Sequence, residues 1–512
     1  MSGKALDKCR SILSEHHFCV AGLLCLVVWL ITGGSASLLN KAGISNTALM
    51  TVHFVIMGAV IFCLLYLVFS KRITDTLACM TLALGGFFAR AWYCIYALTT
   101  EEYQHDVGAF DYNLANASHD NYILYLLYNK HLPDFDFRGT GQFYHPPLHH
   151  FISAVAVKIN SVIFPSRDGD YGFLMCISLF YSLIVLILIY RILKMFGFTG
   201  KSLVIPFAVA CFYPYFIISA GQINNDPLAS MLFIAAIYNA LLWYRERSFK
   251  RIIFTALCIG FAMMAKLSAG FVAFPVGFIF LAALIGARGK DKKMWLQFVS
   301  FAAIVFPLGL WFPIRNYIRW GIPPTYVFDL GIVPNQDLSG YSVLERFFGT
   351  SDASMSIPFV VFDENYHDFN IFTILFKSSL FDDFDHHKNT LFLMLATFML
   401  FLGIALVAVF VTGLVLAVRK CIKEKNVELI SLIVLLVTEF VSISVFAFKY
   451  PLICSVSFRY IFPTVICFLV FTGLCFEKKK NEYITLLQNI GVGAVSVFSL
   501  LSVIFYAAEW MA

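Results

Sequence analysis

Long apolar runs recur along the whole chain, and they are the feature that most restricts how it can fold. Each run holds about 18 residues or more, which is the length that an α-helix needs to cross a hydrocarbon core of roughly 30 Å. Only 13% of the residues are charged, whereas roughly 25% are charged in a typical soluble domain. The sequence therefore predicts an all-α polytopic membrane protein with about 13 transmembrane helices. They are expected at residues 18–38, 49–70, 77–98, 172–195, 202–220, 226–244, 251–266, 268–287, 296–314, 391–418, 428–447, 457–475 and 484–508.

The basic residues are distributed unevenly between the predicted loops. Of the 37 lysines and arginines, 23 fall in short segments on one side of the predicted membrane. Cytoplasmic loops are enriched in these residues, so this side is predicted to be cytoplasmic and to hold the amino terminus. Two long polar loops, 99–171 and 315–390, then face the extracytoplasmic side. Because the net charge of +6 arises largely from these short clusters, it does not indicate binding to nucleic acid.

The segment 147–164 is apolar enough to suggest one more span. A full crossing there would place Arg191 and Lys194 outside and would invert every later loop. Pro146 and Pro147 at its start and Lys158 within it favour a helix that lies on the outer surface or dips into it. We therefore expect a surface helix at this position.

Arg90 and most of the cysteines lie inside the predicted spans, and the arginine and the cysteines are expected to have different roles. Arg90 lies two helical turns or more below the outer end of the third span, where an unpaired charge is costly, so we expect it to have a buried partner. The thirteen cysteines lie mostly in apolar runs and form no CxxC pair. They are predicted to be small core residues rather than a disulfide or zinc framework.

The first outer loop carries a carboxylate directly beyond the third predicted span. Asp106 follows His105 there, in a stretch rich in histidine and aromatic residues. A carboxylate at the membrane surface can act as a general base that deprotonates an acceptor hydroxyl. A solvated loop carboxylate would look the same, and spacing alone favours that simpler interpretation.

The same loop ends in the segment Tyr144-His-Pro-Pro-Leu148. Two prolines restrict the backbone and would hold Tyr144 and His145 rigidly at the start of the surface helix. An ordinary helix start explains the segment equally well.

Polar residues also stand at the outer ends of later spans. Asn225 and Asp226 open the sixth, where Asp226 is either an ordinary helix cap or a residue that positions a metal or a polar acceptor. Lys266, Arg315 and Arg459 lie at the outer face, at a depth that suits a lipid-linked phosphate. Snorkelling toward ordinary lipid headgroups is the competing explanation for each of them.

The second outer loop is rich in Tyr, Asn, Asp and His, a composition that fits the binding of sugar hydroxyls. An acidic solvated loop is the default interpretation. His386 and His387, with Asp382, Asp383 and Asp385, offer metal ligands, but their spacing matches no standard site. We assign no metal to them from the sequence.

Together these residues resemble the GT-C class of integral-membrane glycosyltransferases, and within it the protein O-mannosyltransferase and aminoarabinose-transferase-like group. The resemblance runs in order over roughly residues 77–470, and its most specific piece is the His-Pro-Pro-Leu sequence. It rests on the segments Gln104–Gly108, Tyr144–Leu148, Gln222–Asp226, Ala265–Gly270 and Arg459–Pro463. It implies a GT-C-like fold whose two large extracytoplasmic loops form the active site.

The resemblance also implies inverting transfer of a sugar from a polyprenyl- or dolichyl-phosphate carrier to an acceptor hydroxyl on the extracytoplasmic face. By this analogy Asp106 is the general base, and Asp226 is a second acidic site near the acceptor or a metal. The substrate-binding residues would be His105, Tyr144, His145, Asn225, Asp226, Lys266, Arg315 and Arg459, the last three basic residues binding the donor phosphate. No cofactor is certain, and a divalent metal remains an alternative. The acceptor is a lipid, a glycan, a wall polymer or a protein, and the membrane is a bacterial plasma membrane, or the endoplasmic reticulum in a eukaryote.

The chain departs from the family pattern in ways that bear on its organisation. Its acidic motif is His-Asp rather than the Asp-Glu pair of many mannosyltransferases, which leaves metal dependence and acceptor class open. Two spans precede the one that normally comes first. We therefore predict an appended hairpin at 1–75, a catalytic module at 76–480 and a C-terminal transmembrane helix at 481–512. The lack of a large extracytoplasmic domain favours a lipid, glycan or wall-polymer acceptor over a protein.

Two other functions fit parts of the pattern. A transporter or flippase of a lipid-linked saccharide would bind the same carrier. It should, however, place its polar residues near mid-membrane in broken helices, whereas here they concentrate at the outer ends and in two outer loops. An inactive glycan-binding relative is the third alternative, and the presence of Asp106 argues against it only weakly.

Overall fold

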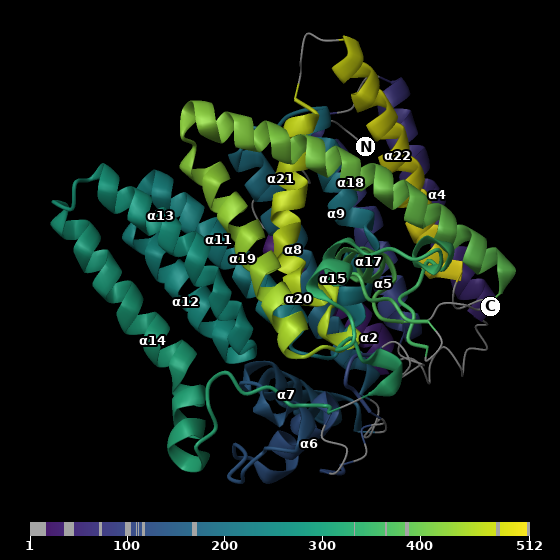
Figure 1. Ribbon diagram of the computed structural model, residues 1–512. Helices are drawn as coiled ribbons and strands as arrows, with labels where there is room; N and C mark the ends of the chain where they lie inside the picture. Colours follow the sequence, from purple (N-terminus) through teal and green to yellow (C-terminus); the bar gives the residue numbers. More distant parts are fainter. Residues whose placement is uncertain are drawn as a thin grey trace.

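A computed structural model describes residues 17–34, 46–70, 74–97, 104–108, 110, 112–114, 118–165, 171–331, 333–363, 366–384, 389–477 and 482–508. Helices dominate this part of the chain, in which the only β-pairing is two isolated bridges (Figure 1). The predicted all-α polytopic architecture is confirmed.

The helices of the bundle coincide with the predicted spans. They are α2 (His17–Gly34), α4 (Asn46–Phe69), α5 (Asp75–Ala97), α8 (Met175–Met195), α9 (Lys201–Phe212), α10 (Pro214–Ile218), α11 (Asp226–Glu246), α12 (Phe249–Ala265), α13 (Ala273–Gly286), α14 (Lys292–Trp320), α18 (Thr390–Glu424), α19 (Val427–Lys449), α21 (Val465–Cys475) and α22 (Glu482–Ala508). Within the described ranges, nine helices are long and apolar enough to cross a membrane, and α9 with α10 adds a tenth if this pair, bent by 55°, is one span. Helices α2, α4 and α12 fall on predicted spans without meeting that criterion. The count of 13 therefore remains a prediction.

Arg90 occupies the break between α9 and α10. Pro214 has no N–H and cannot donate to the carbonyl of Ala210, four residues earlier. The guanidinium of Arg90 replaces the missing donor, with Nη2 2.8 Å from Ala210 O and Nη1 2.6 Å from Cys211 O. Its Nε donates to Ser182 Oγ at 2.9 Å. The buried partners that we predicted for Arg90 are thus backbone carbonyls at the end of α9. The arginine therefore has a structural role at the bend between α9 and α10.

The helices pack in two groups around a shared centre. Figure 1 shows α12, α13 and α14 on one side and α4 and α22 on the other, with α8 and α21 near the centre and α18 running across the bundle. Helices α18 and α21 approach closely at Gly413, where an added Cβ would lie 2.0 Å from Phe471 O. A small residue is required at such a crossing.

The two long loops contain short helices. From the first outer loop come α6 (His119–Asn129), the 3-10 helix η2 (Gly141–Tyr144) and α7 (Leu148–Ile163), and from the second come α15 (Val343–Phe348) and α17 (Ile371–Phe381). Helix α7 is two-faced: His149, His150 and Val157 are buried, whereas Phe151 and Val162 are exposed. Figure 1 shows α6 and α7 together outside the bundle, an arrangement that fits the predicted surface helix. The orientation of the chain in a membrane remains a prediction.

Candidate active site

Segments far apart in the sequence meet at the end of the bundle next to α6 and α7. Gln104, just after α5, holds the first outer loop against the turn between α10 and α11. Its Nε2 donates to Gly221 O at 2.7 Å, and its Oε1 accepts from Ile223 N at 3.0 Å. The start of this loop is thus fixed directly beside Asp226.

Asp106 presents an accessible carboxylate beside a cation. Its side chain is 47% exposed, and its Oδ2 lies 3.8 Å from Arg459 Nη1. The backbone has a φ of 55°, in the left-handed region, and its carbonyl accepts from His119 N at 2.8 Å. The carboxylate can therefore reach a bound hydroxyl while its position is set by the loop.

Asp226 forms an ion pair with Lys266 across the gap between α11 and the end of α12. The Lys266 ammonium also lies 4.7 Å from the centre of the Tyr460 ring. Asn225 ties the two elements together, since its Nδ2 donates to Ala265 O at 2.8 Å. Asp226 and Lys266 thus occupy one polar patch at the outer ends of their helices.

Arg459 links this patch to Asp106. It lies in α20 (Phe458–Ile461), its side chain is only 9% exposed, and its Nη2 donates to Tyr460 Oη at 2.7 Å. Asp106 and Asp226 both interact with it electrostatically. Two cations and two carboxylates therefore alternate in a small region that connects the first outer loop with three helix ends.

The second outer loop contributes a further pair of acids to this region. His105 Nε2 lies 2.9 Å from Oδ2 of Asp382, a fully buried residue at the end of α17, and its ring stacks on Phe384. The neighbouring Asp383 is partly buried, and this burial, followed by the charge of Asp382, raises the pKa of its carboxyl above the usual range. One ligand atom from each of His105, Asp382 and Asp383 lies within 4.8 Å of the others.

A column of aromatic and imidazole rings forms the other wall. His145 lies between Tyr144 at 4.1 Å and His119 at 5.5 Å, measured between ring centres. His119 Nδ1 is 2.9 Å from His150 Nε2. Burial lowers the pKa of His119, His145 and His150 well below the ordinary value, so these imidazoles are neutral. Burial, and then the charge of Asp106, raises the pKa of Tyr144.

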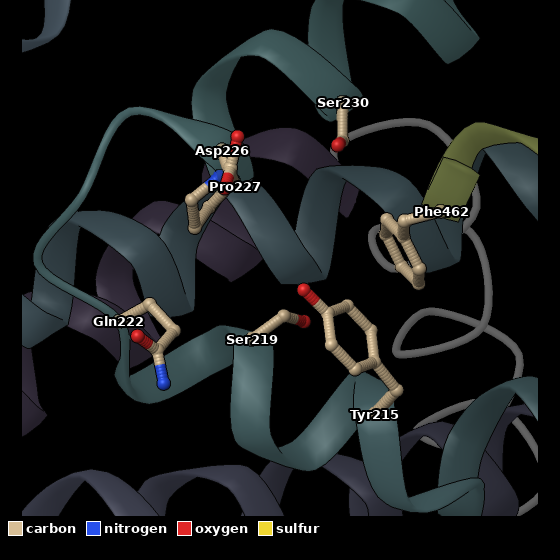
Figure 2. A pocket seen from close by; sticks show the side chains of 7 residues that line it. All are labelled: Tyr215, Ser219, Gln222, Asp226, Pro227, Ser230 and Phe462. Atoms are coloured by element: carbon tan, nitrogen blue, oxygen red, sulfur yellow. The ribbon is translucent and has the colours of Figure 1, made fainter. Parts of the chain in front are cut away.

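A small pocket lies next to Asp226 (Figure 2). Figure 2 shows the hydroxyls of Tyr215, Ser219 and Ser230 turned toward it, with Phe462 at its edge. It is also lined by Gln222 and Pro227. The pocket offers hydroxyl groups and one aromatic face beside the Asp226–Lys266 pair.

The structure brings together eight of the nine residues predicted for the site, and Arg315 is the exception. Arg315 donates to Pro133 O and to Asn316 Oδ1 and lies 4.9 Å over the Trp320 ring. Within the described part of the chain, none of its polar contacts is to Asp106, Asp226, Lys266 or Arg459. Its predicted role at the donor phosphate therefore has no geometric support.

Some residues of the region were missed or left without a role in the sequence. Asp382 and Asp383 were recognised only as acids near a histidine pair, and His386, His387 and Asp385 of that group lie outside the described residues. In the structure, Asp382 and Asp383 lie close to His105 of the first outer loop. Nothing local to either segment signals this pairing, because it depends on how the two loops pack.

Comparison with known proteins bears on the family. Residues 144–311, about a third of the chain, match the dolichyl-phosphate-mannose-protein mannosyltransferase family. The matched stretch begins at Tyr144 and contains Asn225, Asp226 and Lys266. The resemblance to this group that the sequence motifs indicated is confirmed. A search of curated proteins found no match.

Solved structures with a related arrangement of helices share little sequence with this chain. The oligosaccharyltransferase of Archaeoglobus fulgidus in its apo form has a TM-score of 0.48 and 14% identity, over 85% of this chain and 56% of that one. The same enzyme in complex with Zn and sulfate has a TM-score of 0.49 and 12% identity, over 84% and 53%. ArnT from Cupriavidus metallidurans bound to undecaprenyl phosphate has a TM-score of 0.45 and 10% identity, over 85% and 77%. The chain spans about half the length of the archaeal enzyme that it matches.

Proposed function

We propose that this chain is an integral-membrane inverting glycosyltransferase that moves a sugar from a polyprenyl- or dolichyl-phosphate carrier to an acceptor hydroxyl on the extracytoplasmic face. The observation that carries the proposal is the accessible Asp106 carboxylate beside Arg459, with the Asp226–Lys266 pair in the same region. A base next to fixed cations is what transfer from a phosphate leaving group requires. The matched family takes its name from a donor of this kind.

The reaction is a single displacement at the anomeric carbon. Asp106 takes the proton of the acceptor hydroxyl as the oxygen attacks the sugar carbon on the side opposite the phosphate. The bond between that carbon and the phosphate oxygen breaks, and the lipid phosphate leaves with the bonding electrons. Arg459 and Lys266 stabilise the charge that develops on the phosphate. One displacement inverts the configuration at the anomeric carbon.

The other residues align the substrates. Asp226 accepts from Lys266 and so directs the ammonium, while Asn225 fixes the end of α12 at Ala265. Neutral His145 and Tyr144 shape the sugar pocket without adding charge. Because most of the work is alignment of a hydroxyl with a good leaving group, correct positioning is expected to supply much of the rate.

We further propose that His105, Asp382 and Asp383 hold a divalent cation. The donor set fits: one imidazole and two carboxylates converge, and Asp383 Oδ1 is buried without a hydrogen-bond partner among the described residues. A bound cation would supply positive charge at the edge of the site and join the two outer loops. Asp226, the metal ligand considered from the sequence, is already paired with Lys266.

The cation site can be tested without any assay of activity. After chelation and dialysis, the wild-type protein is expected to bind Mn²⁺ or Zn²⁺ at one saturable site. His105→Ala and Asp382→Asn should each weaken that binding by at least about tenfold, because each removes a ligand from a small set. His131→Ala, in the exposed part of the first outer loop, is the matched control. Equal affinity in all four proteins would show that the triad is not the site.

Transfer itself is tested with purified protein in proteoliposomes that contain a polyprenyl-phosphate sugar and candidate acceptors. We expect glycosylated acceptor and free polyprenyl phosphate to form in equal amounts. The rival activity, translocation of the lipid-linked saccharide, would move the donor between leaflets without cleaving it. Movement of intact donor with no release of polyprenyl phosphate would therefore reject the transferase in favour of the transporter.

A further inference from the structure

The first turn of α6 makes a row of hydrogen bonds to the loop that carries Asp106. His119 N donates to Asp106 O at 2.8 Å. The two carboxylate oxygens of Asp120 accept separately from Gly108 N at 2.9 Å and from Phe110 N at 3.0 Å. Asn121 takes up the loop beyond them, because its Oδ1 accepts from the backbone N of Asn113 at 2.6 Å. Three consecutive residues thus hold four backbone positions between 106 and 113.

These three residues are deeply buried. His119 is 3% exposed, and Asp120 and Asn121 are fully buried. A buried carboxylate requires hydrogen bonds in place of water, and Asp120 obtains them from two backbone N–H groups and the hydroxyl of Ser118. Its position in the first helical turn also suits the positive end of the α6 dipole. Asp120 is therefore bound at both ends, to its own helix and to the loop.

The loop needs such external support because its backbone is strained. Asp106 and Phe110 have φ values of 55° and 56°, in the left-handed region that residues with a Cβ rarely adopt. Such conformations persist where surrounding contacts impose them. Asp120 accepts hydrogen bonds from the backbone N–H of Gly108, which lies between the two strained residues, and from that of Phe110, which is one of them. Contacts from α6 thus hold the loop at and after Asp106, while Gln104 and His105 hold it before Asp106.

We propose that Asp120 is a positioning residue that holds the Asp106 carboxylate where it can act as the base. This inference rests on the proposed function of Asp106. Asp120 itself does not touch the reacting groups, and it acts through the backbone of residues 106 to 110. Arg459 and Lys266, to which the donor phosphate is assigned, stand on other elements and, within the described ranges, make no hydrogen bond to Asp120.

The test uses Asp120→Asn in the full-length protein. The amide keeps the size of the side chain, but only one of its two terminal atoms can accept, so one loop N–H loses its partner. We expect kcat to fall roughly 10- to 100-fold, the scale of a misplaced catalytic group, with KM for the donor within about twofold of wild type. Asp136→Asn, which removes an exposed carboxylate of the same outer loop, should leave both constants unchanged.

Hydrogen exchange supplies a second readout that does not require activity. In Asp120→Asn, amides of residues 104–113 should exchange faster, while those of the 219–226 turn and the bundle helices should match wild type. A wild-type kcat in this variant, unchanged exchange in 104–113, or faster exchange throughout the protein would each overturn the positioning role. If the wild-type protein transfers no sugar, the proposed function fails, and exchange still decides whether Asp120 holds the loop.

Discussion

Asp106→Asn is expected to slow sugar transfer severely and to leave donor binding intact. The amide has nearly the same shape as the carboxylate but cannot take a proton from the acceptor hydroxyl. General-base catalysis contributes about 10²- to 10⁴-fold, so kcat should fall by that order. The donor is expected to bind as before, because the phosphate is assigned to Arg459 and Lys266. Transfer kinetics and a separate measurement of donor affinity distinguish the two effects.

Asp329→Asn provides the matched control, because Asp329 is an exposed carboxylate of the second outer loop. It should behave as wild type in both measurements. Since Asp106 is itself largely accessible, its replacement is not expected to lower the thermal stability of the protein. Transfer by Asp106→Asn at the wild-type rate would show that another group takes the proton, and the mechanism would have to be abandoned.

The fold and much of the site were predictable from local features of the sequence. Span positions follow from apolar length, which each segment carries by itself, and the start of α7 follows from Pro146 and Pro147. The residues that gather at the outer end of the bundle, such as Asp106, Asp226 and Arg459, each stand just outside an apolar run. Helix ends on one side of a membrane lie at similar depths, so the sequence predicts that these residues lie near one another.

What the sequence could not predict depends on packing between loops. The contact of His105 with Asp382 joins two loops that no pattern connects. The role of Asp120 depends on the backbone path of residues 106 to 110, and helix propensity suggests only that it begins a helix. Arg315 shows the converse case: it lies near the end of α14, as expected, but its contacts are with Pro133, Asn316 and Trp320 rather than with the cluster.

The broken helix α9–α10 bears on the choice between an enzyme and a transporter. Transporters place ion sites at such breaks, where opened carbonyls face a cavity. Here the carbonyls of Ala210 and Cys211 are bound by Arg90, which is fully buried. The break is therefore closed by the protein itself. The charged residues of the candidate site stand at the helix ends that face the two long loops, an arrangement that favours chemistry at the surface over passage through the membrane.

Arg459→Gln is expected to weaken donor binding more than any other single change at the site. The guanidinium of Arg459 lies beside Asp106 and interacts with Asp226 as well. A phosphate bound between Asp106 and Asp226 would therefore contact this guanidinium directly. A charge-assisted hydrogen bond is worth about 1.5–3 kcal/mol, which corresponds to roughly 10- to 150-fold in donor affinity. Arg459→Lys should recover part of this loss by restoring the charge, and Arg319→Gln, at an exposed position of the outer face, should have no effect.

The double variant Arg459→Gln with Lys266→Met tests whether both cations bind one phosphate. If they do, the two changes should not add, because residues that share a ligand are coupled. Donor affinity measured for the wild type, both single variants and the double variant gives the coupling directly. Strict additivity would show that the two cations do not share one phosphate. Wild-type affinity in Arg459→Gln would remove Arg459 from the donor site and leave it as a structural partner of Tyr460 and Asp106.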